Sequence, residues 1–180
     1  MKRDQETHRS AKGFTLIEMM IVVVIIAVLV AVAIVAYTRH IKSTRIVQEK
    51  VFVSKIQALQ ETYFQRYGVY CNVTDGSPYP GTVPQTGVTF NPGGNWGQLG
   101  ARPESGTTYA SWDVVASEST ANHAVTTGPS WAQSKLTATT GVPWFAVQGR
   151  MDLDGNSASG YTEIYTTSQK GTIWTVGEGN

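Results

Sequence analysis

Cysteine is almost absent from this chain of 180 residues, which contains only Cys71. A secreted domain that is held together by its own disulfide needs at least two cysteines, so other forces must stabilise this one. Cys71 is either a small apolar core residue or an unpaired thiol, and we predict that it lies in the core.

Catalytic residue patterns are absent as well. The three histidines are His8, His40 and His123, and none has neighbours at the spacing of a zinc site or of a nucleophilic triad. No phosphate-binding glycine motif follows a predicted strand. We therefore expect a structural or binding protein and not an enzyme.

Excess charge of either sign is missing too, because the formal net charge is +1. Residues 1–13 hold four Lys/Arg against two Asp/Glu, and residues 14–180 hold ten against eleven. Beyond the helix predicted below, the only cations are Arg102, Lys135, Arg150 and Lys170. A nearly neutral chain is a poor fit to a dedicated polyanion binder, so a nucleic-acid partner is not expected.

One region lacks charge almost completely. Between Phe14 and Tyr37 the only acidic or basic side chain is Glu18. As a helix, these residues would extend about 36 Å, which is enough to cross a bilayer core of about 30 Å. Their Leu, Ile, Val and Phe side chains favour insertion by about 5 to 9 kcal/mol, which exceeds the cost of about 3 kcal/mol for one carboxylate. The segment is expected to enter a membrane despite Glu18.

Two ordinary interpretations of this segment are unsatisfactory. Residues 31–33 (Ala-Val-Ala) could be the cleavage site of a secretory signal peptide, but the apolar run is long for one and contains an acid. A plain membrane anchor would give no reason for Glu18.

A third interpretation uses the flanking residues. Residues 12–20 read KGFTLIEMM, directly after a basic leader and directly before the apolar run. This combination resembles the type IV prepilin signature. The resemblance implies that a prepilin peptidase on the cytoplasmic face cuts between Gly13 and Phe14 and methylates the new amine of Phe14. Glu18 then becomes the fifth residue of the mature chain.

The glutamate has a natural partner in this scheme. An acid within an apolar helix indicates function when a partner can be named, and the amine of Phe14 is cationic even when methylated. Charges attract strongly where the dielectric constant is low, and an unpaired buried charge is costly. We therefore expect Glu18 and the Phe14 amine to fix the axial register between subunits. The simpler alternative is a protonated or snorkelling Glu18.

The helical pattern continues past the apolar run, since no Gly or Pro interrupts residues 14–67. An apolar stripe is expected to pack on the rest of the chain, and Gly68 is the predicted stop. The stripe consists of Phe52, Ile56, Leu59 and Tyr63. Polar residues largely fall on other faces, namely Gln48, Glu49, Lys50, Gln57, Gln60 and Glu61. Many major pilins carry proline in the apolar half, but this chain has Val35 at the corresponding place, so no break in the backbone hydrogen bonds is imposed there.

The C-terminal part is predicted to form a β-sheet after a loop rich in Gly and Pro at 71–108. Strands are predicted at 109–116, 143–150, 161–167 and 172–176, with a hairpin turn at 168–171. Trp112, Trp144 and Trp174 are expected in the core, and Trp131 is expected to anchor an exposed excursion from 117 to 140. The predicted fold is therefore α+β, with a long N-terminal helix packed on an antiparallel sheet, as in type IV pilins.

The resulting division of the chain has five parts. We expect a leader at 1–13, a membrane and filament-core helix half at 14–37, and an amphipathic half at 38–68. A loop at 69–108 and the sheet region at 109–180 follow.

One loop has the composition of a metal site. Asp152, Asp154 and Asn156 alternate between two predicted strands, and Glu163 follows eleven residues after Asp152. Oxygen ligands in this arrangement suit structural Ca²⁺, although Gly155 and Ser157 depart from the EF-hand pattern. The alternative is a tight turn that caps its own backbone.

The resemblance implies a structural subunit of a type IV pilus that serves adhesion, twitching motility or both. Expected partners are the prepilin peptidase, an inner-membrane assembly platform and other pilins, and the precursor would lie in the bacterial inner membrane before export to an extracellular pilus. The alternatives are a pseudopilin of a periplasmic secretion filament, or a minor pilin for tip adhesion or DNA uptake.

Overall fold

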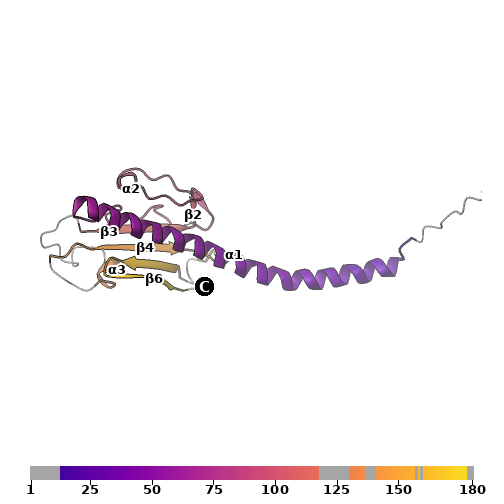
Figure 1. Cartoon of the computed structure of the whole chain (residues 1–180). Coiled ribbons are helices and arrows are strands. Elements are labelled where there is room, and N and C mark those ends of the chain that lie inside the picture. The colour runs from indigo at the N-terminus through magenta and orange to yellow at the C-terminus, as the bar shows by residue number, and fades with distance from the viewer. Residues whose placement is uncertain (1–12, 118–129, 137–140, 157, 159, 178–180) are drawn as a thin grey trace, which may run out of the picture. The chain divides into compact units, whose positions relative to one another are not determined.

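The computed structural model describes residues 13–117, 130–136, 141–156, 158 and 160–177. The chain divides into two compact units, Met1–His40 and Ile41–Asn180. Helix α1 (Leu16–Tyr67) contributes to the first unit and provides one layer of the second (Figure 1). The predicted long N-terminal helix is confirmed, and it continues through Val35 without interruption.

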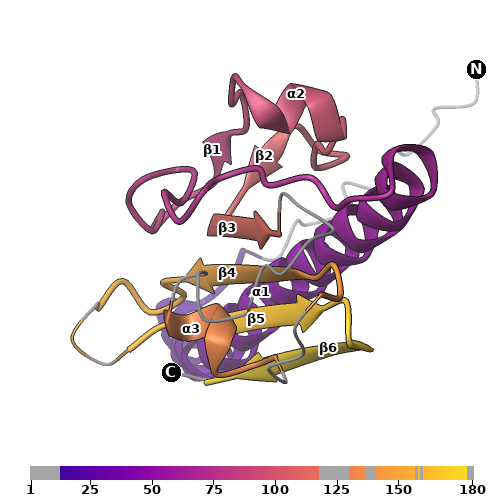
Figure 2. The same ribbon diagram turned by 90° about the vertical axis from the view of Figure 1, so that its left-hand side faces the viewer.

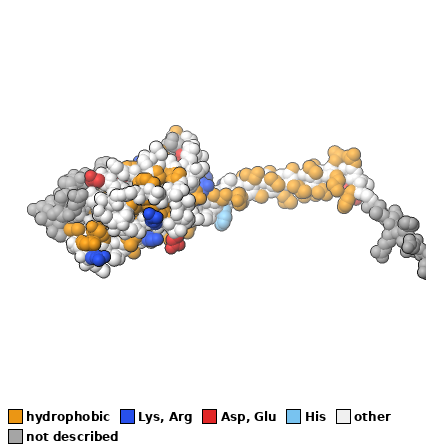
Figure 3. Space-filling model, turned by 90° about the horizontal axis from the view of Figure 1, so that it is seen from above, with side chains coloured by type: hydrophobic (Ala, Val, Ile, Leu, Met, Phe, Trp, Pro, Cys, Tyr) orange, Lys and Arg blue, Asp and Glu red, His pale blue; other side chains and the backbone are white. Residues whose placement is uncertain are grey.

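The first unit is a helix that is apolar on every side. From Phe14 to Tyr37 every residue is exposed, with Leu16 at 78% and Val32 at 71%. Figure 3 shows that these side chains give an almost continuous hydrophobic surface. This segment of α1 is long and apolar enough to cross a membrane. A helix with this surface requires an apolar environment on all sides.

The second half of α1 packs on the rest of the second unit through the predicted stripe. Phe52 and Ile56 are buried, and Leu59 and Tyr63 pack against the same core. The helix ends at Gly68, whose φ of 74° is left-handed and whose N–H donates to the carbonyl of Phe64 at 2.8 Å. Glycine adopts this conformation without steric cost, so the predicted stop is confirmed.

The sheet has four antiparallel strands in the order β3-β4-β5-β6 (Figure 2). Their bounds are Ala110–Ala116, Phe145–Met151, Thr162–Thr167 and Lys170–Val176. Both the predicted strands and the α+β class are therefore confirmed. The predicted turn was two residues too long, because Thr167 pairs with Lys170 and only Ser168 and Gln169 connect the strands.

The two faces of the sheet pack against different elements, because successive side chains of a strand alternate. Val114 and Val147 face α1 in the main core, whereas Val115 and Ala146 belong to a smaller cluster on the other face. That second cluster includes residues from the region of α3 (Ser130–Gln133), namely Ala132 and Leu136. The helix face and the outer face are therefore distinct surfaces.

A glycine in β4 makes room for the largest side chain of the core. Trp112 is 0% exposed, and a Cβ added to Gly149 would lie 2.4 Å from its ring. Contacts that short do not occur, so only glycine lets the indole of Trp112 lie across its cross-strand neighbour.

The region predicted as a loop at 71–108 is more ordered than expected. It contains β1 (Val88–Thr89), α2 (Asn95–Leu99) and β2 (Thr107–Thr108), and β1 pairs with β2. Phe90 and Trp96 are buried with their rings against each other at 5.1 Å. Large aromatic side chains anchor this segment, which composition alone did not indicate.

Cys71 is buried, as predicted, and burial raises the pKa of its thiol to about 11.

Trp112 and Trp144 are buried, although Trp144 lies just before β4. The core prediction was wrong for Trp174, which is only half-buried and stacks on Tyr165. Trp131 donates from Nε1 to Asp113 at 2.9 Å and so anchors α3; most of the predicted excursion, with His123, lies outside the described residues.

Candidate processing and assembly site

The predicted cleavage junction lies just before the first turn of α1. Gly13 and Phe14 are exposed and non-helical, and residues 1–12 lie outside the described part of the chain. A Cβ on Gly13 would meet no atom within 4 Å, and its φ is not in the left-handed region. Among the described residues, no contact and no backbone conformation requires a glycine at this position.

Glu18 and Thr15 together form the start of α1. The Thr15 N–H and the Thr15 hydroxyl each donate to Glu18 Oε2 at 2.8 Å. In return, the Glu18 N–H donates to Thr15 Oγ1 at 3.3 Å. This reciprocal arrangement is a capping box, in which two otherwise unsatisfied amide groups of the first turn find partners.

The capping box was missed at the sequence level, although its signal is present. A threonine followed three residues later by glutamate, ahead of an apolar run, is the usual signature. The arrangement keeps the Glu18 carboxylate at the helix N-terminus, where the helix dipole also favours a negative charge. The freed amine of Phe14 would be only one residue before Thr15, so the predicted partner and the carboxylate belong to the same end of α1.

The pattern of polar residues assigns a second glutamate of α1, Glu49, to an outer face, but the side chain is only 2% exposed. Its carboxylate accepts bonds from the Tyr109 N–H at 2.6 Å and from Thr108 Oγ1 at 3.1 Å, and Trp112 Nε1 donates to the same hydroxyl at 2.9 Å. The assignment failed because the buried strip of α1 is wider than the apolar stripe.

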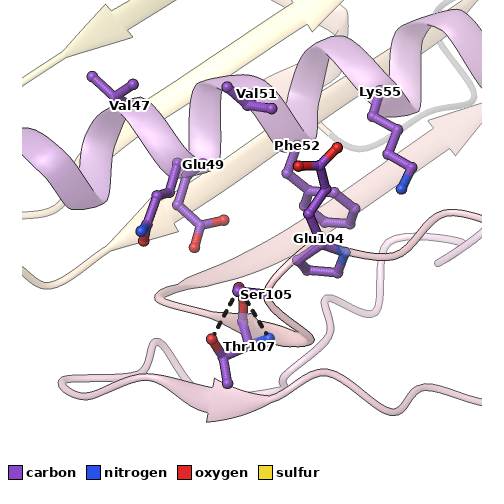
Figure 4. Close-up of a pocket in the computed structure, with 10 residues that line it drawn as sticks. Val47, Glu49, Val51, Phe52, Lys55, Glu104, Ser105 and Thr107 are labelled. Carbon is purple, nitrogen blue, oxygen red and sulfur yellow. Dashed lines mark hydrogen bonds between the residues drawn. The ribbon is translucent and has the colours of Figure 1, made fainter.

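Glu49 also borders a groove of about 480 Å³ between α1 and the segment that precedes β2. Figure 4 shows its carboxylate pointing toward this segment. The groove is lined by Val47, Val51, Phe52, Lys55, Pro103 and Glu104, among others. Burial raises the pKa of Glu49 to about 7, against the opposing effect of its hydrogen bonds. A carboxyl group that is half-ionised near neutrality makes this contact sensitive to pH.

Gln60 is a second buried polar residue for which the sequence pattern predicts an outer face. It is 0% exposed, and its side chain makes two bonds to Cys71: Nε2 donates to the carbonyl at 2.7 Å, and Oε1 accepts from the N–H at 2.8 Å. The backbone N–H and carbonyl of Cys71, which are costly to bury without partners, are thereby hydrogen-bonded. Gln60 therefore joins α1 to the chain that follows it.

The candidate calcium loop forms a series of turns bonded to its own backbone. Asp152 accepts from the Gly155 N–H at 2.8 Å, Asp154 from the Asn156 N–H at 2.9 Å, and Asn156 from the Ala158 N–H at 3.3 Å. Glu163 lies in β5, opposite Arg150. Among the described residues, no group of three or more His, Cys, Asp or Glu is placed to hold a metal. Calcium binding stays a prediction.

Comparison with known proteins adds one finding at the N-terminal site. Residues 8–34 match the family model described as the prokaryotic N-terminal methylation motif. No curated protein and no solved structure matches the chain significantly. The matched residues include the Gly13–Phe14 junction, Glu18 and most of the apolar half of α1. The chain therefore carries the leader signature of type IV prepilins, on a helix-and-sheet fold consistent with that of type IV pilins.

Proposed function

We propose that this chain is a structural subunit of an extracellular type IV pilus, used for adhesion or twitching motility. The observation that carries the proposal is the methylation motif placed on a helix whose apolar surface is exposed on every side. Such a surface suits two environments, a bilayer and a bundle of like helices. A precursor stored in the membrane would assemble by moving its apolar helix from the bilayer into the bundle of like helices.

Processing at Gly13–Phe14 prepares this exchange. The prepilin peptidase removes the basic leader, which would otherwise hold four Lys/Arg side chains at the end of an apolar helix. Charged side chains are expensive in an apolar bundle, so a helix that retained the leader would be a poor filament core. The same cut creates a cationic amine at Phe14.

Glu18 then selects one axial position among many apolar ones. Apolar helix surfaces can slide past one another with little change in energy, whereas a charge pair in a low-dielectric core forms at one offset only. The capping box holds the carboxylate at the helix start, and both bonds to it use Oε2. In the filament, the amine of an incoming Phe14 would pair with Glu18 of a neighbouring subunit.

The proposed partners follow from this sequence of events. They are the prepilin peptidase, an inner-membrane assembly platform, and other pilins that form the polymer. The precursor would reside in the bacterial inner membrane, and the assembled subunit would lie outside the cell. In this role the chain catalyses no reaction.

A pseudopilin of a periplasmic secretion filament is the second candidate. The observation that favours it is the uninterrupted course of α1 through Val35, where many major pilins carry a proline that can open the helix. The two candidates differ in the location of the filament, which is outside the cell for a pilus and in the periplasm for a pseudopilin.

Fractionation of the native organism separates them. Surface filaments are sheared from cells and probed for this chain, with and without the prepilin peptidase. A pilus subunit is expected in the sheared fraction only when the peptidase is present. Recovery in the periplasm and envelope alone would favour the pseudopilin, and recovery of untrimmed chain in surface filaments would contradict both.

A further inference from the structure

One turn of α1 holds Tyr109 at two points. Glu49 accepts a hydrogen bond from the Tyr109 N–H at 2.6 Å, and the guanidinium carbon of Arg45 lies 4.7 Å from the centroid of the Tyr109 ring. Arg45 and Glu49 are four residues apart in the helix, so their side chains lie on the same side of it. We name Arg45, Glu49 and Tyr109 the Tyr109 clamp.

The ring of Tyr109 has a second neighbour just before β1. A Cβ added to Gly87 would lie 2.9 Å from this ring, so the glycine lets the ring pack directly against the backbone that leads into β1. Strand β1 pairs with β2, which ends directly before Tyr109. The clamp therefore attaches the small sheet of β1 and β2 to α1.

The Glu49 carboxylate has hydrogen bonds but lacks a cation. It is 2% exposed, and its donors are the Tyr109 N–H and the Thr108 hydroxyl. Among the described residues, none of the contacts that shift its pKa comes from a Lys or Arg side chain. An ionised carboxylate in such a place is costly unless a cation pairs with it. Loss of the proton therefore creates a demand for a nearby positive charge.

Three further charged side chains lie near this position. Lys55 and Glu104 line the same groove as Glu49, Glu104 from the segment that precedes β2 (Figure 4). Lys55 is six residues from Glu49, about 9 Å along the helix, and Lys50 lies about 100° further round it. Arg45 already contacts the residue to which Glu49 is bonded, so rotation about its side-chain bonds is enough to bring its guanidinium to the carboxylate.

We propose that the Tyr109 clamp is a pH-sensitive switch. While Glu49 is protonated, Arg45 stays on the Tyr109 ring; when the proton leaves to solvent, Arg45 turns from the ring to the carboxylate. The exchange is favourable because a buried charge gains more from an opposite charge than a half-buried ring gains from a cation. Above the transition the ring has lost one of its two neighbours, so the sheet of β1 and β2 is held to α1 less firmly. The switch lies within the second unit and does not rest on the proposed function.

The test is a pH titration of the full chain in detergent micelles, followed by NMR with ¹³C in the glutamate carboxyl groups and the tyrosine rings. Glu49→Gln identifies the Glu49 signal. In the wild type, the Glu49 carboxyl and the Tyr109 ring should titrate with one common midpoint, at or below about pH 7. Arg45→Gln should raise the Glu49 midpoint by about 1 pH unit, because the ionised carboxylate loses its cation, and should abolish the titration of the Tyr109 ring.

Two matched variants serve as controls. Arg45→Lys retains the charge, so its Glu49 midpoint should stay close to that of the wild type. Lys55→Gln removes another cation that lines the groove and should leave the midpoint unchanged.

Three results would overturn the proposal. They are an unchanged Glu49 midpoint in Arg45→Gln, an equal rise in Lys55→Gln, and a Tyr109 ring signal that stays constant while Glu49 titrates in the wild type. The last measurement needs no substitution in the clamp, so it decides the proposal even if Arg45→Gln does not fold.

Discussion

The two halves of α1 use the same backbone conformation for opposite purposes. The first half exposes apolar side chains on all sides and has one acid, which caps the helix start. The second half buries an apolar stripe together with Glu49 and Gln60, whose side chains bond the chain that packs on it. Glu49 and Gln60 in the second half therefore serve the fold, whereas the role that we propose for Glu18 in the first half is a contact with another subunit.

The largest expected effect comes from the junction that precedes the first half. Gly13→Val should block trimming completely and leave folding of the second unit unchanged, because the added side chain meets open space. Gly81→Val is the matched control, since a Cβ there also meets nothing within 4 Å. The measurement is the size of the chain on a gel. Normal trimming of Gly13→Val would show that the junction is elsewhere.

Two substitutions of Glu18 separate its roles in capping and in charge pairing. Glu18→Gln retains a hydrogen-bond acceptor for Thr15 and removes the charge, whereas Glu18→Ala removes both. If charge pairing fixes the register, both variants should be trimmed normally and both should lower filament incorporation more than tenfold, which corresponds to about 1.4 kcal/mol or more. The yield of sheared filaments measures this. Full incorporation of Glu18→Gln would leave capping as the only role.

In the second half of α1, the raised pKa of Glu49 predicts that the stability of the fold depends on pH. Its pKa is raised from 4.5 to about 7 by burial, so the folded state holds the proton more tightly than the unfolded state. The contribution of the protonated Glu49 side chain to the free energy of unfolding is fully present below pH 4.5 and is lost as the pH rises through about 7. The difference is about 3 kcal/mol at most.

Denaturant unfolding of the full chain, followed by tryptophan fluorescence across this pH range, tests the assignment. Glu49→Gln should abolish the decline between pH 4.5 and 7, since an amide does not titrate there. A variant that declines as steeply as the wild type would assign the effect to other groups.

A smaller effect is expected in the sheet. Gly149→Ala forces a methyl group against the Trp112 ring and should lower the free energy of unfolding by about 1 to 3 kcal/mol. Gly171→Ala is the control, because its nearest contact is the end of the Gln57 side chain at 3.4 Å. Equal stability of the two variants would mean that the Trp112 ring can move aside without cost.

The smallest expected effect concerns the loop of Asp152. If the loop binds Ca²⁺, millimolar calcium should stabilise the full chain by a few tenths of a kcal/mol to about 1 kcal/mol. Asp154→Asn should remove this gain and leave the stability without calcium nearly unchanged. Isothermal titration and thermal unfolding measure it. If calcium produces neither heat nor stabilisation, the loop does not bind it and serves only as a turn.

The sequence was a good guide wherever one physical signal dominated. The apolar run, the stripe at Phe52 and Ile56 and the stop at Gly68 each follow from helix periodicity or backbone sterics, and the structure has all of them. The alternating strands were found within two residues of their predicted bounds for the same reason.

The failures share a different cause, which is tertiary context. Glu49 is polar and was placed outside, but its burial depends on Thr108 and Tyr109, which are far away in the sequence. Trp174 is apolar and was placed inside, but β6 is the edge strand, where the outer face is incompletely covered. Neither the contacts that bury Glu49 nor the incomplete covering of Trp174 could be predicted from local sequence patterns.

In the proposed function, a cut after Gly13 frees the amine that Glu18 neutralises. The most direct measurement is the mass of the N-terminal peptide of the chain isolated from its native organism. A peptide that begins at Phe14 and carries one methyl group is the predicted result. A peptide that begins at Met1, or just beyond Ala33, would contradict the account.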